Sequence, residues 1–154
     1  MKKAILLVED EDDDVLFMKM AMEKAGITHP LQVARDGKQA IAYLRGDGLF
    51  ANRQQYPVPQ LMLLDLRLPQ IPGLEVLKWT REQPEFEMLP VVVFTSSSQD
   101  ADVERAYRLG ANSYIVKPPS PDELLEIVQA IKVYWLQINH APPVWVEAEA
   151  TRGE

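Results

Sequence analysis

Four short apolar segments of this chain each run directly into polar side chains that can carry out chemistry. The segments and the residues that follow them are 5–8 with Glu9 and Asp10, 61–64 with Asp65, 91–94 with Thr95, and 114–116 with Lys117. Segments this short, and rich in Val, Ile and Leu, are typical of strands buried on both faces of a parallel sheet. Because ligands of such sheets bind outside the carboxyl ends of the strands, we expect these polar side chains to meet at one edge.

Helical patterns alternate with the apolar segments along the chain. We expect strands over 3–8, 31–34, 61–65, 90–95 and 113–117, and helices over 11–25, 72–83, 99–109 and 121–138, with one more helix that begins at Asp36 and ends before Asp47. This alternation predicts the α/β class with a parallel sheet, in one domain over residues 1–138. We expect residues 139–154 to form a loosely ordered C-terminal tail. The long connection over 46–60 is either a packed surface insertion or a specific binding loop.

The composition excludes several classes of protein. The chain of 154 residues has the length of one domain, and with 47% hydrophobic and 25% charged residues it is neither disordered nor membrane-like. No apolar stretch reaches the length of a membrane span, and the acids at 9–11 end the first apolar run too early for a signal peptide. The absence of cysteine excludes disulfides and thiolate sites, so we expect a cytoplasmic protein. A net charge of −7 argues against binding to nucleic acid.

The acidic residues at the expected sheet edge need a counter-charge. Glu9, Asp10 and Asp65 would repel one another within a few ångströms, and a hard dication relieves this repulsion. Mg²⁺ fits because it takes oxygen ligands and uses one or two carboxylates together with phosphate oxygens. Asp65 can then act as a nucleophile that forms an acyl phosphate. The Lys117 ammonium and the Thr95 hydroxyl can contact the phosphoryl oxygens.

Each of these residues also has a plainer interpretation. Asp65 could cap a helix, Thr95 could begin the helix that follows it, and Lys117 could be a solvated strand end. The three acids at 12–14 are assigned only to a helix N-terminus, where carboxylates interact favourably with the helix dipole. The metal site is favoured because all the reactive groups fall at strand ends in one alternating pattern.

Five sequence motifs follow one another in order along the chain. They are Val-Glu-Asp at 8–10, Leu-Asp-Leu-Arg-Leu-Pro at 64–69, Phe-Thr-Ser at 94–96, Gly-Ala at 110–111, and Tyr-Ile-Val-Lys-Pro at 114–118. With these motifs the chain resembles the receiver domain of bacterial two-component response regulators over residues 3–138. The resemblance implies a flavodoxin-like, doubly wound sheet of five parallel strands in the order 2-1-3-4-5, with helices on both faces.

The resemblance also implies a role for each matching residue. Asp65 matches the phosphoacceptor, Asp10 the direct metal ligand, Glu9 a ligand through water, Arg67 a ligand through its backbone carbonyl, Thr95 and Lys117 the phosphate-sensing pair, and Tyr114 the aromatic switch. The family implies a switch and not a conventional enzyme, with Mg²⁺ as cofactor and a sensor histidine kinase as partner. The long connection over 46–60, the Trp-bearing last helix and the Pro-Pro tail are similar to single-domain regulators that serve phytochromes. Output is then expected to run through protein–protein contacts.

Two other functions are open at this point. A flavodoxin-like FMN-binding protein shares the fold class, but the acids at 9–12 would repel its phosphate. An aspartyl-phosphate phosphatase would carry an acid two residues after its nucleophile, where this chain has Arg67. Arg67 and Ser97 also stand where some receivers have an amide or acid that orients water, so we expect slow hydrolysis of the acyl phosphate.

Two expectations concern the switch itself. The Lys117–Pro118 peptide bond is expected to be cis, because proline reduces the trans preference to roughly 0.5–1 kcal/mol. Phosphorylation is expected to draw the Thr95 hydroxyl toward the phosphate and to let Tyr114 turn inward.

A last expectation concerns assembly. The helix over 121–138 is apolar on more than one face, which predicts that a second surface is buried. We expect a symmetric homodimer through helix 99–109, strand 113–117 and helix 121–138; Tyr107, Tyr134 and Leu136 lie on this face. The alternative is that the tail folds back through Val144 and Trp145 and covers the same face.

Overall fold

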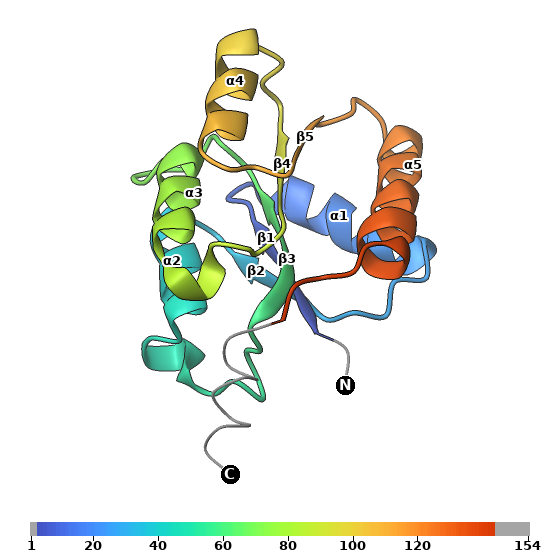
Figure 1. The fold of residues 1–154 in the computed structure, drawn as a ribbon. Helices are drawn as coiled ribbons and strands as arrows, with labels where there is room; N and C mark the ends of the chain where they lie inside the picture. The colour runs from blue at the N-terminus through green and yellow to red at the C-terminus, as the bar shows by residue number, and fades with distance from the viewer. Residues whose placement is uncertain (1–2, 144–154) are drawn as a thin grey trace.

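The computed structural model describes residues 3–143 and contains one sheet of five parallel strands. The strands are β1 (Ala4–Val8), β2 (Leu31–Ala34), β3 (Pro59–Leu64), β4 (Val91–Thr95) and β5 (Ser113–Val116). Their order is β2-β1-β3-β4-β5, so the order that the family resemblance implied is confirmed (Figure 1). The strand bounds agree with the sequence prediction to within about two residues, which is the ordinary uncertainty of such boundaries.

Helices cover both faces of this sheet. They are α1 (Asp12–Lys24), α2 (Gly37–Arg45), α3 (Gly73–Glu82), α4 (Asp100–Arg108) and α5 (Pro121–Ile131), with the short 3-10 helices η1 (Gly48–Ala51) and η2 (Pro84–Phe86) and the π-helix η3 (Lys132–Ile138). α1 and α5 pack on one face, and α2, α3 and α4 pack on the other (Figure 1). No helix in the part of the chain that the structure describes is long and apolar enough to cross a membrane.

The core consists of two apolar clusters, one on each face of the sheet. In β1, Leu6 and Val8 belong to one cluster, and Ile5 and Leu7 belong to the other. Successive side chains of a strand point to opposite faces, so a strand covered on both sides must be apolar at every position. All five residues of β1 are buried, which explains the unbroken apolar runs in the sequence.

Two helices begin at side-chain caps that fix the loops after the strands. The Asp36 carboxylate accepts a hydrogen bond from the backbone NH of Gln39 at 2.7 Å, so α2 begins where the sequence predicted. The Ser120 hydroxyl accepts a hydrogen bond from the backbone NH of Glu123 at 3.2 Å at the start of α5. The loop between β5 and α5 therefore ends at a defined point, which matters because it begins at the functional edge of the sheet.

The connection over 46–60 is packed onto the domain. The Arg53 guanidinium donates hydrogen bonds to the carbonyls of Tyr43 at 2.8 Å and Tyr56 at 3.2 Å. The rings of Tyr43, Phe50 and Tyr56 contact one another, with centroids between 5.1 and 6.1 Å apart. These contacts favour the interpretation of this segment as a packed insertion.

The C-terminal helix differs from the prediction in its second half. The expected helix over 121–138 changes to a π-helix at Lys132, and Asn139 donates its backbone NH to the carbonyl of Tyr134 at 2.6 Å. Pro142 and Pro143 then line a shallow hollow with Met88 and other residues at the amino ends of β3 and β4. The expected contacts of Val144 and Trp145 lie outside the described residues.

Candidate functional site

The candidate site lies at the carboxyl edge of the sheet, where four strands end. The register pairs the last residues of β1 and β3, so Glu9 and Asp65 leave the sheet side by side. It also pairs the last residues of β4 and β5, so Lys117 leaves the sheet next to Thr95. The backbone NH of Lys117 donates to the carbonyl of Thr95 at 2.8 Å, which fixes the start of the loop.

Three carboxylates form a group that could hold a metal ion. Glu9, Asp10 and Asp65 each offer an oxygen, and these oxygens all lie within 4.8 Å of one another. Glu9 is 1% exposed and Asp65 is 4% exposed, so their charges cannot be screened by water. Asp10 is partly buried. A set of carboxylate oxygens of this kind is the chemistry that a hard divalent cation prefers. The prediction that these three residues lie together is confirmed.

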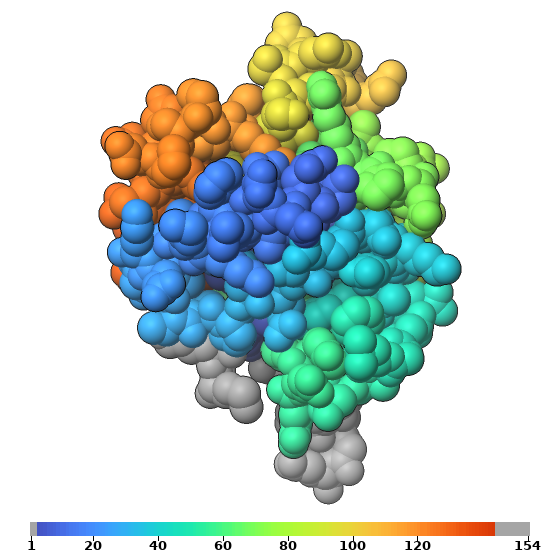
Figure 2. Space-filling model, turned by 180° about the vertical axis from the view of Figure 1, so that it is seen from behind, coloured from blue at the N-terminus to red at the C-terminus, as the bar shows by residue number. Residues whose placement is uncertain are grey.

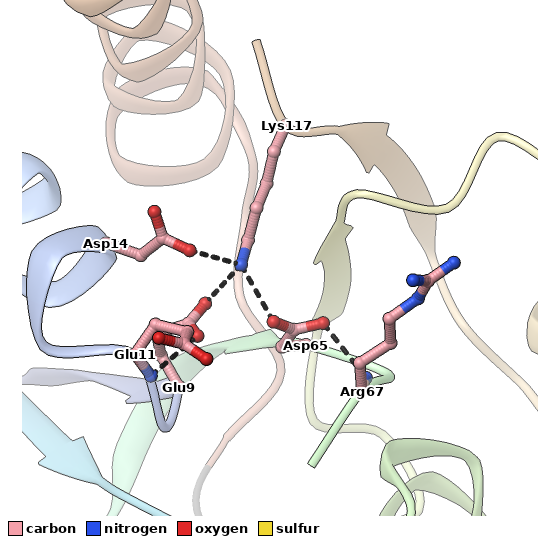
Figure 3. Close-up of polar contacts among 6 residues, drawn as sticks. All are labelled: Glu9, Glu11, Asp14, Asp65, Arg67 and Lys117. Carbon is pink, nitrogen blue, oxygen red and sulfur yellow. Dashed lines mark hydrogen bonds and ion pairs between the residues drawn. The ribbon is translucent and has the colours of Figure 1, made fainter. Parts of the chain in front are cut away.

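The Lys117 ammonium occupies the centre of the site. It donates hydrogen bonds to Glu9 Oε2 at 2.6 Å, to Asp65 Oδ2 at 2.8 Å and to Asp14 Oδ2 at 2.8 Å (Figure 3). An ammonium has three donors, and all three are used here. The positive charge therefore joins, through one nitrogen, the residues that follow β1 and β3 and a residue of α1.

Burial and the ammonium act against each other on the two buried acids. Burial raises the pKa of Glu9 to about 7, although the hydrogen bond from Lys117 lowers it in part. Burial alone would also raise the pKa of Asp65, but the hydrogen bonds from Lys117 and from the backbone NH of Arg67 bring it below its ordinary value. Burial would lower the pKa of Lys117, but its carboxylate partners raise it above its ordinary value. Asp65 is therefore held as a carboxylate, whereas Glu9 takes up a proton near neutral pH.

The Thr95 hydroxyl is buried and has no full hydrogen bond, although it lies near enough to Asp65 to help lower the pKa of that carboxyl. Its oxygen has no hydrogen bond to any residue that the structure describes, and Thr95 is 0% exposed. Most buried hydroxyls are paired, because a buried donor without an acceptor is costly. An oxygen that arrives on Asp65, one strand away, would give this donor an acceptor.

Tyr114 is tied to the loop between β4 and α4. Its hydroxyl donates to the carbonyl of Ser97 at 2.9 Å, and the Ser97 hydroxyl donates to Asp102 Oδ2 at 2.5 Å. Tyr114 is partly buried and packs against the core cluster on this face of the sheet. The Tyr114 ring is therefore held by the loop in the unphosphorylated protein. Its inward movement on phosphorylation stays a prediction.

The expected cis bond at Lys117–Pro118 is wrong. The structure has no cis peptide bond among residues 3–143, so this bond is trans. The long side chain of Lys117 reaches Asp65 at 2.8 Å from a trans backbone, so no cis bond is needed to direct the ammonium.

Arg67 holds the nucleophile through its backbone. Its NH donates to Asp65 Oδ1 at 3.0 Å, and Figure 3 shows its guanidinium directed away from Asp65. Both oxygens of Asp65 are therefore engaged, one by Arg67 and the other by Lys117. The role of the Arg67 carbonyl as a metal ligand stays a prediction.

Two residues of the site go beyond those that the sequence predicts. The sequence places Asp14 only at a helix N-terminus, yet its carboxylate contacts Lys117. Asp14 lies in the first turn of α1, which begins at Asp12, and the sequence pattern carries no signal for its contact with Lys117. Gly73 was not singled out, but a Cβ there would lie 2.1 Å from the backbone oxygen of Asp65, so only glycine fits.

The three residues predicted for the dimer face differ in how exposed they are. Tyr107 and Tyr134 are 49% and 50% exposed and are available for an interface. Leu136 is only partly buried and packs against the core beside α1, so part of its side chain is left for an interface, and its place on the dimer face stays a prediction. The π-helix is the reason for this partial burial, because its i→i+5 pattern turns the side chains after Lys132 away from the positions of a regular α-helix.

The family of the chain follows from comparison with known proteins. The sequence model of the response regulator receiver domain matches residues 5–129, and the chain belongs to this family. It is thus a receiver domain of two-component signalling. The flavin-binding and phosphatase alternatives are not favoured.

Individual relatives include regulators linked to phytochromes. The chain is 41% identical over 141 residues to the probable methanogenesis regulatory protein FilR2 of Methanothrix harundinacea, which covers 90% of this chain and 86% of the relative. It is 38% identical over 140 residues to the response regulator Rcp1 of Synechocystis, covering 91% and 93% of the two chains. The structure of the phosphorylated cyanobacterial phytochrome response regulator RcpA superposes with a TM-score of 0.86 at 36% identity, covering 93% of this chain and 100% of the other.

Proposed function

We propose that this receiver accepts a phosphoryl group on Asp65 in the presence of Mg²⁺ and signals through protein–protein contacts. The observation that carries the proposal is the Lys117 ammonium, which bridges Asp65 and Glu9 at the edge where Asp10 adds a third carboxylate. A positive charge beside an ionised carboxylate that belongs to an acid set able to hold a metal ion suits the transfer of a phosphoryl group. The relative Rcp1 has a Mn²⁺-bound form, which supports a divalent cation as the cofactor of this receiver.

The chemistry needs little proton movement. An Asp65 oxygen attacks phosphorus, the new O–P bond forms as the P–N bond of a donor phosphohistidine breaks, and the released imidazole nitrogen takes a proton from water. Mg²⁺ in the carboxylate set would supply positive charge to the phosphoryl oxygens. Lys117 transfers a hydrogen bond from Asp65 to a phosphoryl oxygen, and the unpaired Thr95 hydroxyl donates to another.

Labelling tests this proposal directly. With radiolabelled acetyl phosphate and Mg²⁺, we expect stoichiometric labelling of the wild type and none of Asp65→Asn. Asp13→Asn is the matched control, because Asp13 is an exposed acid of α1 outside the carboxylate set. EDTA should abolish labelling. Equal labelling of Asp65→Asn and wild type, or labelling that survives EDTA, would falsify the assignment.

We propose that the phosphoryl donor is a sensor histidine kinase, and specifically a phytochrome. The similarity to RcpA, a cyanobacterial phytochrome response regulator, supports the choice of kinase. α1 carries the exposed apolar residues Leu16, Phe17 and Met20 and lies beside α5 on the face shown in Figure 2. A hollow of about 280 Å³ beside Phe17 reaches Lys117, so a kinase bound here would lie next to the site.

A charged substitution on this surface distinguishes phosphorylation by a kinase from phosphorylation by acetyl phosphate. Phe17→Asp should slow phosphorylation by a cognate kinase at least tenfold, which is the order of loss expected when one hot-spot residue of an interface is removed. Labelling by acetyl phosphate should not change, because Phe17 does not contact Asp65. Loss of both activities would indicate damage to the site, and loss of neither would exclude this surface.

We also propose a homodimer through α4, β5 and the C-terminal helix. Tyr107, Val116 and Tyr134 are large exposed side chains on these elements. Tyr134→Glu should give a monomer that is still phosphorylated. Light scattering that shows a wild-type monomer at every concentration, with and without phosphorylation, would exclude the dimer.

A further inference from the structure

The three partners of the Lys117 ammonium come from three different elements. Glu9 follows β1, Asp65 follows β3, and Asp14 lies in the first turn of α1. The side chain of Lys117 is 14% exposed, and that of Asp14 is 37% exposed. Asp14 thus contacts the ammonium from the outer side of the site, while the other two carboxylates contact it from within.

Two of these partners have another task. Glu9 and Asp65 belong to the set of oxygens within 4.8 Å that could hold a cation, and Asp65 is also the proposed phosphoacceptor. Asp14 is not a member of that set. When a cation and a phosphoryl group engage Glu9 and Asp65, Asp14 is the one carboxylate on Lys117 that neither of them uses.

The neighbouring acids of α1 do not share this position. Asp12 pairs with Arg35, and Asp13 is exposed and is not among the ion-pair partners of Lys117. The next residue, Val15, is 2% exposed and packs in the core, so the first turn of α1 is fixed to the sheet. Asp14 is therefore presented to Lys117 by a rigid element.

We propose that Asp14 is a positioning residue for phosphoryl transfer, and that it acts by holding the Lys117 ammonium beside Asp65 while the other two partners change their contacts. This inference rests on the proposed function of Asp65. Lysine has a flexible four-carbon stem, so a nitrogen that keeps only shifting partners samples many positions. A fixed carboxylate limits that freedom, and small displacements of a catalytic group reduce the rate.

The test compares two variants that remove the same charge from the same helical turn. Asp14→Asn removes the contact with Lys117, whereas Asp13→Asn does not. With the full chain, saturating Mg²⁺ and radiolabelled acetyl phosphate, we expect Asp14→Asn to lower the maximal rate of Asp65 labelling about tenfold, with the half-saturating donor concentration changed less than about twofold. Asp13→Asn should keep the wild-type values, and Asp14→Glu should recover part of the lost rate.

A double-mutant cycle with Lys117 identifies the route of the effect. In a Lys117→Ala background, Asp14→Asn should cause no further loss, because the group it positions is gone. Equal rates for Asp14→Asn and Asp13→Asn would overturn the inference. A faster rate for Asp14→Asn would overturn it too, because Asp14 would then restrain Lys117 and not position it.

Two controls distinguish a failure of the proposed function of Asp65 from a failure of the proposed role of Asp14. If the wild type is not labelled, the proposed function fails; if the wild type is labelled and the two Asn variants are equal, only the role of Asp14 fails. Urea unfolding should give the same midpoint for both Asn variants. If Asp14→Asn does not fold, Asp14→Ser against Asp13→Ser makes the same comparison with the same outcomes.

Discussion

Two partly buried cations, Arg53 and Lys117, stabilise this protein in different ways. Within residues 3–143, the hydrogen bonds of the Arg53 side chain go only to neutral backbone carbonyls, those of Tyr43, Leu44 and Tyr56. The Lys117 ammonium donates, among the described residues, only to carboxylates. Burial lowers the pKa of Arg53, whereas the carboxylate partners raise the pKa of Lys117.

The partners explain why one region is fixed and the other can switch. Carbonyl oxygens keep the same charge under all conditions, so the Arg53 contacts join α2 to the 46–60 insertion permanently. Carboxylates can gain a proton, a metal ion or a phosphoryl group, and each of these changes what Lys117 contacts. A buried cation with carbonyl acceptors therefore holds two elements together under all conditions. A buried cation with carboxylate acceptors can change its partners, as a switch requires.

The largest expected effect is on the stability that the Arg53 contacts give the fold. Arg53→Ala should lower the free energy of unfolding by about 3 kcal/mol, because it leaves charge-assisted hydrogen bonds to α2 carbonyls unmade. The loss should be the same with Mg²⁺ and with EDTA in urea titrations. Arg45→Ala is the control: Arg45 forms an exposed ion pair with Asp47, so its loss should cost less than about 0.5 kcal/mol. A Mg²⁺-dependent loss for Arg53→Ala would contradict the distinction.

The second effect is on the switch. Lys117→Ala in EDTA at pH 8 should cost about 2 kcal/mol, because three carboxylates lose their counter-charge. Added Mg²⁺ should restore more stability to this variant than to the wild type, because it supplies the missing charge. Lys132→Ala is a matched control, since Lys132 donates to the carbonyl of Ala25 at 2.8 Å and its loss should not respond to Mg²⁺. Equal responses of the two variants would remove the distinction between carboxylate and carbonyl partners.

The third effect is a pH dependence of metal binding. The pKa of Glu9 is about 7 in the folded protein against 4.5 ordinarily, so Glu9 holds a proton below pH 7. Without metal, this raised pKa stabilises the fold at pH values below 4.5, and the contribution is lost as the pH rises through 7. Mg²⁺ must displace that proton, so its affinity should fall about tenfold from pH 8 to pH 6. Isothermal titration of Glu9→Gln should show a flatter dependence, and an equally steep one would show that another group titrates.

The smallest expected effect concerns the lifetime of the acyl phosphate. Arg67→Asn should speed hydrolysis about threefold, because an amide can orient water that a guanidinium, which has no acceptor, cannot. Decay of the radiolabel after donor removal measures this rate, with Arg108→Asn on the exposed face of α4 as the control. A lifetime that is unchanged or longer would show that position 67 does not control access of water.

The strand ends were predictable from sequence because the rule behind them is local. Unbroken apolar runs identify buried parallel strands, and parallel strands end at a common edge, which places Glu9, Asp65 and Lys117 together. The contact of Asp14 depends on how the first turn of α1 returns over that edge, which the alternation of strands and helices does not contain. The position of Leu136 depends on a π-helix, and nothing in the apolar pattern of 121–138 distinguishes it from an α-helix.

The unpaired hydroxyl of Thr95 and the fully bonded ammonium of Lys117 imply an order of events. Thr95 has only a weak interaction with Asp65 and no full hydrogen bond to give up, so it can respond as soon as a phosphoryl oxygen comes within reach. Lys117 must first exchange one of its three carboxylates for that oxygen. The two groups would therefore respond one after the other. The Thr95 hydroxyl would bind the phosphoryl group first, and the Lys117 ammonium would follow once one of its carboxylate partners has been replaced.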